Sequence, residues 1–467
     1  MKKQLFFDDS QLFGRDNVKR VYMHPEKIAE YKDGVCSTDF CTANVFKLDD
    51  GRYRMLYFGH SAQFSGKRLF SAISEDGINL SPERIRDAED GVYSHEVMQI
   101  PRGSEVATVI DTGTAKERYK LLMSEFDDDT YSVNDPLYVS DDLLSWTLKS
   151  GVSWGDKTEP LASAFYNKHK RCYTIVLRPF WGVRTVGCKN TTDFQSFTEY
   201  RNILGVDSCD GILDELYGML AFEYDGNYIG IPHMYRGLKS EYSAKYKNGI
   251  IDTQLAYSLD GDYWKRSLRE PFLSGGEELP LLWVASVLRR EDGVYLYGSA
   301  SECEHGTVFN TPGDHGRICV YKLRTDGFIA LKSENSHLPS RVITREKIWN
   351  GGNLHININA KNVTVGVFVT EETESVGLNA LGKARPIEGF TAADCIPFSG
   401  DSVDCIPRFK SGRTLDELVG KTLVFEINFE DGTLFSLYGS YTDVFNTEGA
   451  RYRKFGAMPA RAEAFEV

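Results

Sequence analysis

The sequence predicts an all-β protein built as a five-bladed β-propeller followed by a C-terminal β-sandwich. Three observations predict it: a supply of aromatic residues that favour strands, a tyrosine-led segment that recurs five times, and a change of pattern after about residue 335. Of the 467 residues, 41% are hydrophobic and 12% are aromatic. This length exceeds one ordinary core, so we expect residues 1–335 to form the propeller and residues 336–467 to form the sandwich.

The recurring segment is a tyrosine followed by an apolar run, which reads as the second strand of a hairpin. Successive tyrosines lie between 54 (173−119) and 67 (295−228) positions apart, which suits a four-stranded blade. A turn-forming or charged pair such as Asp50-Gly51 stands just before each run, and an apolar strand precedes the pair. The five segments begin at Tyr53, Tyr119, Tyr173, Tyr228 and Tyr295.

A second recurring feature follows each hairpin, namely a third strand that ends in an acidic turn. Ser74-Glu-Asp76-Gly77 and Ser258-Leu-Asp260-Gly261 are two examples. Where an aromatic residue follows the turn, we expect it to begin a fourth, outer strand. The acidic residues of the five turns are Asp76, Asp142, Asp193, Asp260 and Asp326.

The C-terminal part shows the two-residue alternation of a half-buried strand. Residues 355–359, 363–369 and 423–429 read as strands of a sandwich, and Glu430-Asp431-Gly432 reads as a hairpin turn. We expect the stretch between about residues 377 and 418 to consist of loops that connect the sheets. We expect the sandwich to stabilise the propeller. A homo-oligomer formed through the sandwich is an alternative that the sequence leaves undecided.

Charge and motifs exclude several classes of function. The net charge is −13 and no long basic run occurs, so nucleic acids and acidic membranes are not expected as partners. No signal peptide or membrane span is evident, and the nine cysteines lack paired metal-ligand spacing, which favours a cytoplasmic protein with reduced thiols. No phosphate loop, nucleophile elbow or zinc-protease motif is present, so we expect neither a cofactor nor a metal.

Acidic residues recur at the starts of the first strands. In a propeller these strands line the central axis, so their starts converge at one end of the channel. Glycoside hydrolysis needs such carboxyl groups, one as a proton donor and one as a nucleophile or base. The alternative is that they form ion pairs with Arg178, Arg184 or Arg236, which we expect for about half of them. The acids are Asp39, Glu105, Glu159, Asp214, Glu215, Glu277 and Glu278.

A propeller with an appended sandwich and acids at these places resembles the invertase, inulinase and levanase glycosidases and their bacterial relatives. The resemblance implies that Asp39, in Ser37-Thr38-Asp39-Phe40, is the nucleophile. It places Glu159, in Thr158-Glu159-Pro160, where the family has a transition-state-stabilising Asp, and Glu215 where the family has its acid/base. The family's Asn-Asp-Pro-Asn-Gly motif is absent, so fructoside specificity is not carried over.

Further polar residues at the same rim are candidates for binding sugar hydroxyls. Several stand at the ends of second strands, which also reach the rim, including His60, Glu125 and His305. For the histidines, a buried structural role is an equal alternative. Trp181 and Trp283 are candidates for stacking on sugar faces, with a core position as the alternative. The substrate-binding candidates are Asp214, Glu105, Arg178, His233, Glu278 and Glu302.

The sequence therefore predicts a retaining, exo-acting glycoside hydrolase for a short oligosaccharide, with catalytic residues Asp39, Glu159 and Glu215. Two alternatives stay open. One is a transglycosidase or a phosphorylase on the same fold, in which a sugar hydroxyl or phosphate replaces water and the three arginines supply a phosphate site. The other is a non-catalytic glycan-binding propeller, because a fold alone does not fix a function.

Overall fold

The structure is a computed structural model whose described parts form an all-β chain, as predicted. It describes residues 2–32, 42–61, 64–87, 93–101, 104–125, 135–155, 158–179, 183–242, 247–307, 315–370 and 384–444. Within these ranges the one helical element is a 3-10 turn, η3 (Leu415–Leu418), and no helix is long and apolar enough to cross a membrane. The chain divides into a large unit (His24–Arg324) and a terminal unit (Met1–Met23 with Thr325–Val467).

Three sheets of the large unit are antiparallel meanders that open with the predicted hairpins. Gly51, Glu117 and Arg171, in the hairpin turns, have positive φ angles of 92°, 49° and 54°, the left-handed conformation that tight turns require. The sheets are β5 (Thr42–Lys47), β6 (Tyr53–Ser61), β7 (Phe64–Ser74) and β8 (Ser81–Pro82), with β9 (Glu96–Gln99) on β7; β10 (Ser104–Asp111), β11 (Tyr119–Glu125), β12 (Pro136–Ser140) and β13 (Thr147–Ser153); and β14 (Thr158–Asn167), β15 (Cys172–Pro179), β16 (Val186–Thr191) and β17 (Arg201–Leu204).

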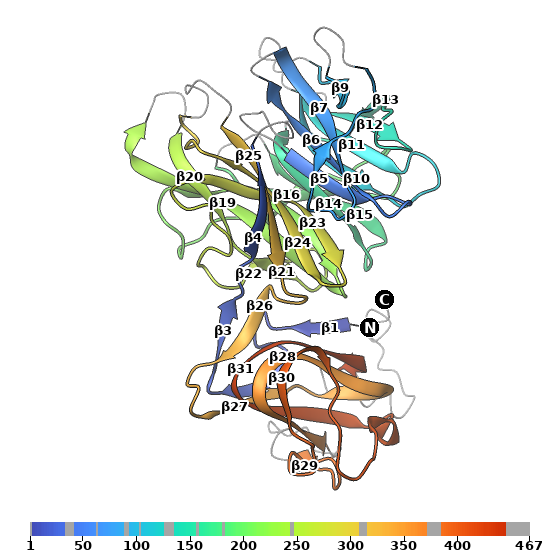
Figure 1. Cartoon of the computed structure of the whole chain (residues 1–467), viewed down its shortest axis with the longest axis vertical. Coiled ribbons are helices and arrows are strands. Elements are labelled where there is room, and N and C mark those ends of the chain that lie inside the picture. The colour runs from blue at the N-terminus through green and yellow to red at the C-terminus, as the bar shows by residue number, and fades with distance from the viewer. Residues whose placement is uncertain are drawn as a thin grey trace. The chain divides into compact units, whose positions relative to one another are not determined.

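The remaining strands of the large unit form one nine-stranded sheet that contains the last two hairpins. Its halves are joined by a single parallel pairing, Ile251 with Leu281. The second half is completed by β4 from the start of the chain, which the sequence pattern did not reveal, and Figure 1 shows the dark blue β4 beside the gold β25. The strands are β18 (Asp214–Tyr224), β19 (Asn227–Tyr242), β20 (Lys247–Thr253), β21 (Ala256–Ser258) and β22 (Lys265–Arg266), then β23 (Leu281–Arg290), β24 (Gly293–Ser301), β25 (Gly316–Leu323) and β4 (Glu26–Tyr31).

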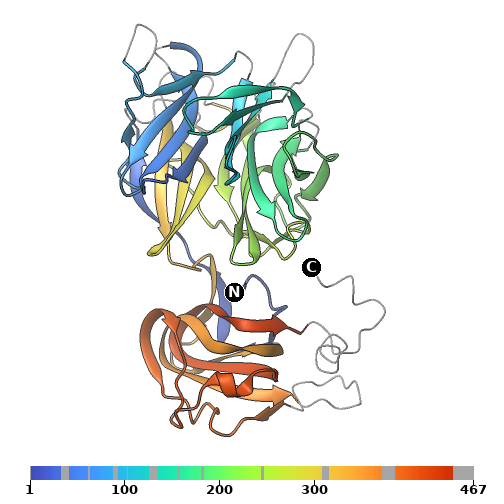
Figure 2. The same ribbon diagram turned by 90° about the vertical axis from the view of Figure 1, so that its right-hand side faces the viewer.

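The first strands of the five hairpins contact one another in a closed ring. β5 contacts β10, β10 contacts β14, β14 contacts β18, β18 contacts β23, and β23 contacts β5. Hydrogen bonds connect neighbours: the Val109 backbone N–H donates to Asn44 Oδ1 at 3.1 Å, and Ser163 Oγ donates to the Met219 carbonyl at 2.9 Å. Figure 2 shows the blue, green and yellow sheets of this unit as separate curled ribbons. The arrangement is propeller-like.

Four of the five predicted acidic turns share one geometry between the third and fourth strands. In the first, Asp76 Oδ1 accepts the backbone N–H groups of Ile78 and Asn79 at 2.8 and 2.7 Å, and Ser74 Oγ donates to it at 2.9 Å. In each turn the residue after the acid has a positive φ between 54° and 76°. These turns are short because the carboxylate supplies the acceptor that the reversed backbone needs. The acids are Asp76, Asp142, Asp193 and Asp260.

The fifth predicted turn, at Asp326, is different and belongs to the terminal unit. The Asp326 side chain is 1% exposed, and it accepts hydrogen bonds from Lys3 Nζ at 2.9 Å and Ser436 Oγ at 2.6 Å. β25, the strand before it, pairs with β4 instead of with a strand that follows the turn. Asp326 therefore satisfies donors in a core and does not close a blade.

The terminal unit combines the first strands of the chain with its last ones. The sequence pattern assigns residues 1–335 to the propeller, whereas the division of the structure places residues 1–23 and 325–335 here. The reason is strand pairing: β1 pairs with β31, β2 with β27, and β3 with β26. The strands are β1 (Lys2–Leu5), β2 (Leu12–Asp16), β3 (Val18–Tyr22), β26 (Ile329–Ser333), β27 (Pro339–Thr344), β28 (Lys347–Thr370), β29 (Ala384–Pro386), β30 (Phe398–Cys405) and β31 (Thr422–Asp443).

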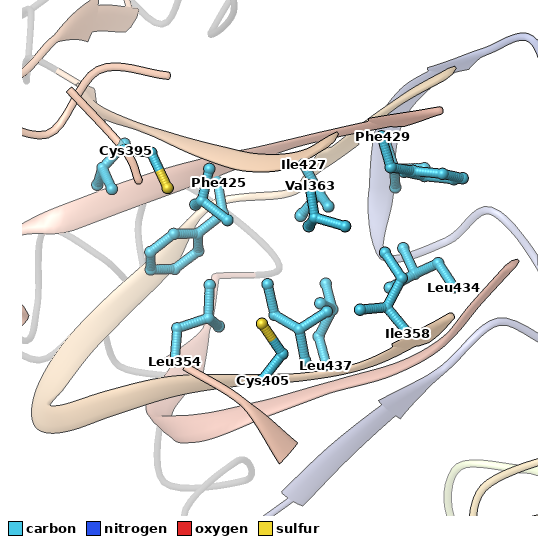
Figure 3. Packing of buried hydrophobic residues seen from close by; sticks show 14 of the residues in the cluster. Leu354, Ile358, Val363, Cys395, Cys405, Phe425, Ile427, Phe429, Leu434 and Leu437 are labelled. Atoms are coloured by element: carbon cyan, nitrogen blue, oxygen red, sulfur yellow. The ribbon is translucent and has the colours of Figure 1, made fainter. Parts of the chain in front are cut away.

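The core of the terminal unit lies between the two arms of its long strands. β28 and β31 pair along most of their lengths, and each contains a residue of positive φ where it reverses, Asn362 at 50° and Asp431 at 41°. Asp431 is the turn expected from the sequence. Figure 3 shows two rows of side chains that face each other, with Phe425 and Ile427 in one row and Leu437 in the other. Burial of these apolar side chains is the main stabilising term.

Candidate active site

The starts of the first strands gather at one end of the large unit. Lys67, near the start of β7, pairs with Glu105 at the start of β10. The guanidinium of Arg178, at the end of β15, lies 4.4 Å from the ring centroid of Tyr217, near the start of β18. His305, which follows β24, is 3.1 Å from the same tyrosine hydroxyl. In an antiparallel hairpin the second strand ends where the first begins, so these contacts mark a single end, the strand-start end.

Glu215 is the central carboxyl group of this end. It is the second residue of β18, its side chain is 9% exposed, and Arg184 Nη1 donates a hydrogen bond to its Oε2 at 2.5 Å. The Arg184 side chain, which stands just before β16, remains 26% exposed. The pair places a guanidinium directly beside this carboxyl group at the start of β18.

Two tyrosines form a wall beside this ion pair. The rings of Tyr217 and Tyr235 are stacked, with centroids 6.3 Å apart, and the Arg184 guanidinium lies 5.6 and 5.0 Å from them. Arg178 lies over Tyr217 as well, at 4.4 Å. Tyr235 stands opposite Glu215 in the strand register. Cation–π attraction thus holds two guanidinium groups at the acid/base candidate.

His305 completes the wall from the neighbouring hairpin. Its ring lies edge-on to both tyrosine rings, with centroids 5.3 Å from each, and a hydrogen bond of 3.1 Å joins its Nε2 to the Tyr217 hydroxyl. The residue is 6% exposed, and its backbone N–H donates to the Gly249 carbonyl at 3.0 Å. The histidine therefore fixes the tyrosine hydroxyl at the strand-start end.

Asp214, a substrate-binding candidate, instead belongs to a buried ion-pair network. Arg236 Nη1 donates to Asp214 Oδ2 at 2.6 Å, while Nε and Nη2 of the same guanidinium both reach Asp252 at 3.1 Å. Burial raises the pKa of Asp252, and Arg236 opposes this only in part. Asp214 therefore takes the alternative role expected for some of the acids, an ion pair with an arginine. Because Arg236 is engaged in this pair, it is not available to bind a phosphate.

The other acidic candidates either form ion pairs of their own or are exposed. Glu105 pairs with Lys67, and Glu302 pairs with the buried Arg317. Burial works to raise the pKa of Glu302, but the charges and hydrogen bonds of Arg317 and Lys32 together hold that pKa below its ordinary range. Glu278 is exposed in the turn before β23. Of these three, the structure shows ion pairs for the first two and an open position for the third.

Two aromatic candidates are buried beneath the site and not on its surface. His233 is 3% exposed, and its Nε2 lies 3.0 Å from the Val284 carbonyl of β23. Burial, with the nearby charge of Arg178, lowers the pKa of His233 to about 4, so the ring is neutral at pH 7. Trp283 is 1% exposed and packs with Tyr235. Both are core residues, and neither is accessible for stacking on or binding a sugar.

Of the two remaining catalytic candidates, the structure describes only the backbone of Glu159. Asp39 lies outside the described residues, as does Trp181. Glu159 is the second residue of β14, and its backbone lies opposite Arg178 in the strand register, which places it at the strand-start end. The Glu159 side chain lies outside the described part of the structure. Within the described ranges no group of His, Cys, Asp and Glu side chains is arranged to bind a metal ion.

The sequence reasoning missed the roles of Tyr217 and Tyr235. Strand alternation did not reveal Tyr217, because the register shifts between Leu216 and Gly218 and leaves Tyr217 as the extra residue there. No sequence signal placed Tyr235 opposite, since that depends on the hairpin register and on the irregularity between Leu216 and Gly218. Arg184 was considered only as an ion-pair partner or a phosphate ligand.

Comparisons with known proteins give no family. No family model and no curated protein matches the chain. One similar solved structure is an N-acetylgalactosamine deacetylase from F. plautii in complex with blood group B trisaccharide, with 11% identity, coverage of 67% of this chain and 97% of that chain, and a TM-score of 0.45. A second is a β-1,2-mannobiose phosphorylase from Listeria innocua, with 12% identity, coverage of 66% of this chain and 97% of that chain, and a TM-score of 0.43. A third is a glycosyl hydrolase from Bacteroides ovatus, with 13% identity, coverage of 69% of this chain and 97% of that chain, and a TM-score of 0.41. None of these three is named as an invertase, and with TM-scores below 0.5 they decide neither fold nor activity.

Proposed function

We propose that the chain is a glycan-processing enzyme, and more narrowly a glycoside hydrolase that cleaves a short oligosaccharide. The observation that carries this is the buried Glu215 at the strand-start end, held between Arg184 and a tyrosine wall. The proposal includes a five-bladed propeller made of the five hairpin units, a sandwich made of the terminal unit, and a cytoplasmic location.

The proposed reaction is retaining. Glu215, once protonated, gives its proton to the glycosidic oxygen as the bond from that oxygen to the anomeric carbon breaks, and Asp39 forms a bond to the same carbon. Glu215 then takes a proton from a water molecule whose oxygen bonds to the anomeric carbon as the bond from that carbon to Asp39 breaks, and the sugar is released. Glu159 interacts with the developing positive charge or a substrate hydroxyl. Arg184 must leave Glu215 before the first step, and its 26% exposure provides a route to solvent.

A phosphorylase is the second candidate, because Arg178 and Arg184 both lie over Tyr217 beside Glu215. Guanidinium groups bind phosphate well, and phosphate in place of water would attack the anomeric carbon and leave a sugar phosphate. Transfer to a sugar hydroxyl follows the same scheme. A non-catalytic glycan-binding propeller is the remaining alternative, with no single feature in its favour.

The test is a comparison of Glu215→Gln with Glu223→Gln on one strand. Glu223, near the far end of β18, is 26% exposed and pairs with Lys168 at 2.8 Å, so it controls for a lost carboxylate away from the site. Fructosides, arabinofuranosides, galactosides and glucosides are offered with and without phosphate, and the anomeric products are followed by NMR. We expect Glu215→Gln to lose about 100-fold or more in turnover and the control to keep its activity.

Each outcome separates the candidates. Turnover that needs phosphate and yields a sugar phosphate would replace the hydrolase by the phosphorylase. Equal activity of both variants would refute the role of Glu215. Binding without turnover, unchanged when Asp39, Glu159 and Glu215 are replaced together, would identify a glycan-binding protein.

A further inference from the structure

The terminal unit contains a cavity of about 360 Å³ that enters its apolar core. It opens between β28 and the segment around β30. Ile356, Val363 and Val365 line its floor, and all three belong to the hydrophobic core cluster of this unit. Figure 3 shows Val363 pointing into this core between the rows of side chains. The volume falls at the lower end of the range that small-molecule sites occupy.

The mouth of the cavity is apolar and exposed. Ile396 and Ile406 line it, and they are 49% and 37% exposed. Pro397 and Pro407 stand beside them. Large aliphatic side chains held in water around a concave opening favour an apolar ligand, because a ligand would remove both the mouth and the floor from solvent.

One cation stands at this mouth. Arg408 lines the cavity and is exposed. Among the residues that the structure describes, its guanidinium makes no hydrogen bond, ion pair or ring contact. Asp404, the acid of the lining, is already engaged, since its Oδ1 accepts hydrogen bonds from His355 Nδ1 at 2.5 Å and the Tyr438 hydroxyl at 2.8 Å. The lining thus carries one carboxylate, which is hydrogen-bonded to His355 and Tyr438, and one guanidinium that is available to a ligand.

We propose that this cavity binds a small amphiphilic anion, an alkyl or aryl carboxylate with its apolar part among Ile356, Val363 and Val365 and its charge at Arg408. A neutral sugar does not fit the lining, in which Phe398 is the one aromatic residue and Ser402 the one hydroxyl. The inference concerns the terminal unit and is independent of the function proposed for the large unit.

The experiment uses two probes of equal chain length and opposite charge, octanoate and octylammonium. Isothermal titration calorimetry on the full chain is expected to give octanoate a dissociation constant at least fivefold lower than that of octylammonium. Arg408→Gln is expected to weaken octanoate binding about tenfold and to abolish the preference, because it removes a charge-assisted hydrogen bond. Asp404→Asn is expected to tighten octanoate binding.

Two further variants serve as controls for the proposed anion site. Arg413→Gln removes an exposed arginine of the same segment that pairs with Glu417 at 2.8 Å and does not line the cavity, so octanoate binding is expected to stay unchanged. Ile396→Asn, at the half-exposed mouth, makes the opening polar without adding a charge, and it is expected to weaken both probes without loss of fold. Equal affinity of the wild type for both probes, no octanoate binding, or equal effects of the two arginine variants would overturn the proposal.

Discussion

The carboxylate of the first acidic turn is expected to make folding stability depend on pH. Burial alone would raise the pKa of Asp76, but the backbone N–H groups of Asn79 and Ile78, with Ser74 Oγ, donate to the charged form and together lower that pKa to about 2. In an unfolded chain the pKa returns to about 3.8. The stabilisation is therefore fully present above about pH 4 and is lost as the pH falls from 3.8 toward 2.

The size of this stabilisation follows from the same values. One pKa unit is worth about 1.36 kcal/mol, so the drop corresponds to at most about 2.4 kcal/mol. Asp76 is partly exposed, and solvent screening reduces this to about 1 kcal/mol. Asp76→Asn keeps an acceptor for the backbone and removes only the charge. We expect its free energy of unfolding to fall by about 1 kcal/mol at pH 7 and by about half as much at pH 3.

Urea unfolding at pH 7, 5 and 3 measures this loss. Asp87→Asn is the matched control, because the Asp87 side chain is 85% exposed and pairs with Arg84 at 2.5 Å on the surface. Its loss is expected to stay below about 0.5 kcal/mol at every pH. A deficit of Asp76→Asn that does not change between pH 7 and pH 3, or that equals the control, would refute the reasoning.

One substitution tests packing in the large unit, and a pair of substitutions tests a buried ion pair there. Gly187→Ala is expected to lower the free energy of unfolding by about 1–3 kcal/mol, because a Cβ at this position would overlap the ring of Tyr200, and the urea midpoint measures the loss. Asp210→Asn is expected to cost about 3–5 kcal/mol, since it leaves the 1%-exposed Arg266 without its buried carboxylate partner. Asp207→Asn, at 48% exposure, should cost far less, and equal losses in the two aspartate variants would contradict this account.

Much of the large unit could be predicted from local patterns. The tyrosine-led runs and the turn pairs before them gave the five hairpins, because the hydrophobic period and the turn chemistry are written within a few residues. The acidic turns were recognisable for the same reason, and Asp76 and Asp260 show the expected geometry. Asp326 broke the pattern, because its turn leads into a strand that pairs elsewhere.

The candidate site was less predictable than the fold. Glu215 stands at the strand-start end as expected, yet its ion pair with Arg184 joins residues 31 positions apart. Asp214 carries the same type of side chain but is held by Arg236. Neighbouring carboxyl groups on one strand point to opposite faces, so each contacts a different set of charged residues. The sequence does not show which charged residues lie on each face.

The sequence by itself determined the all-β class, the hairpins and the positions of the acids, since these depend on residue type and short spacing. Tertiary structure alone decided that β4 completes the last sheet of the large unit and that β1, β2 and β3 join the terminal unit. It also decided that His233 is buried and neutral. Pairing between strands hundreds of residues apart is selected by the burial of complementary faces, and no local pattern in the chain records which faces will meet.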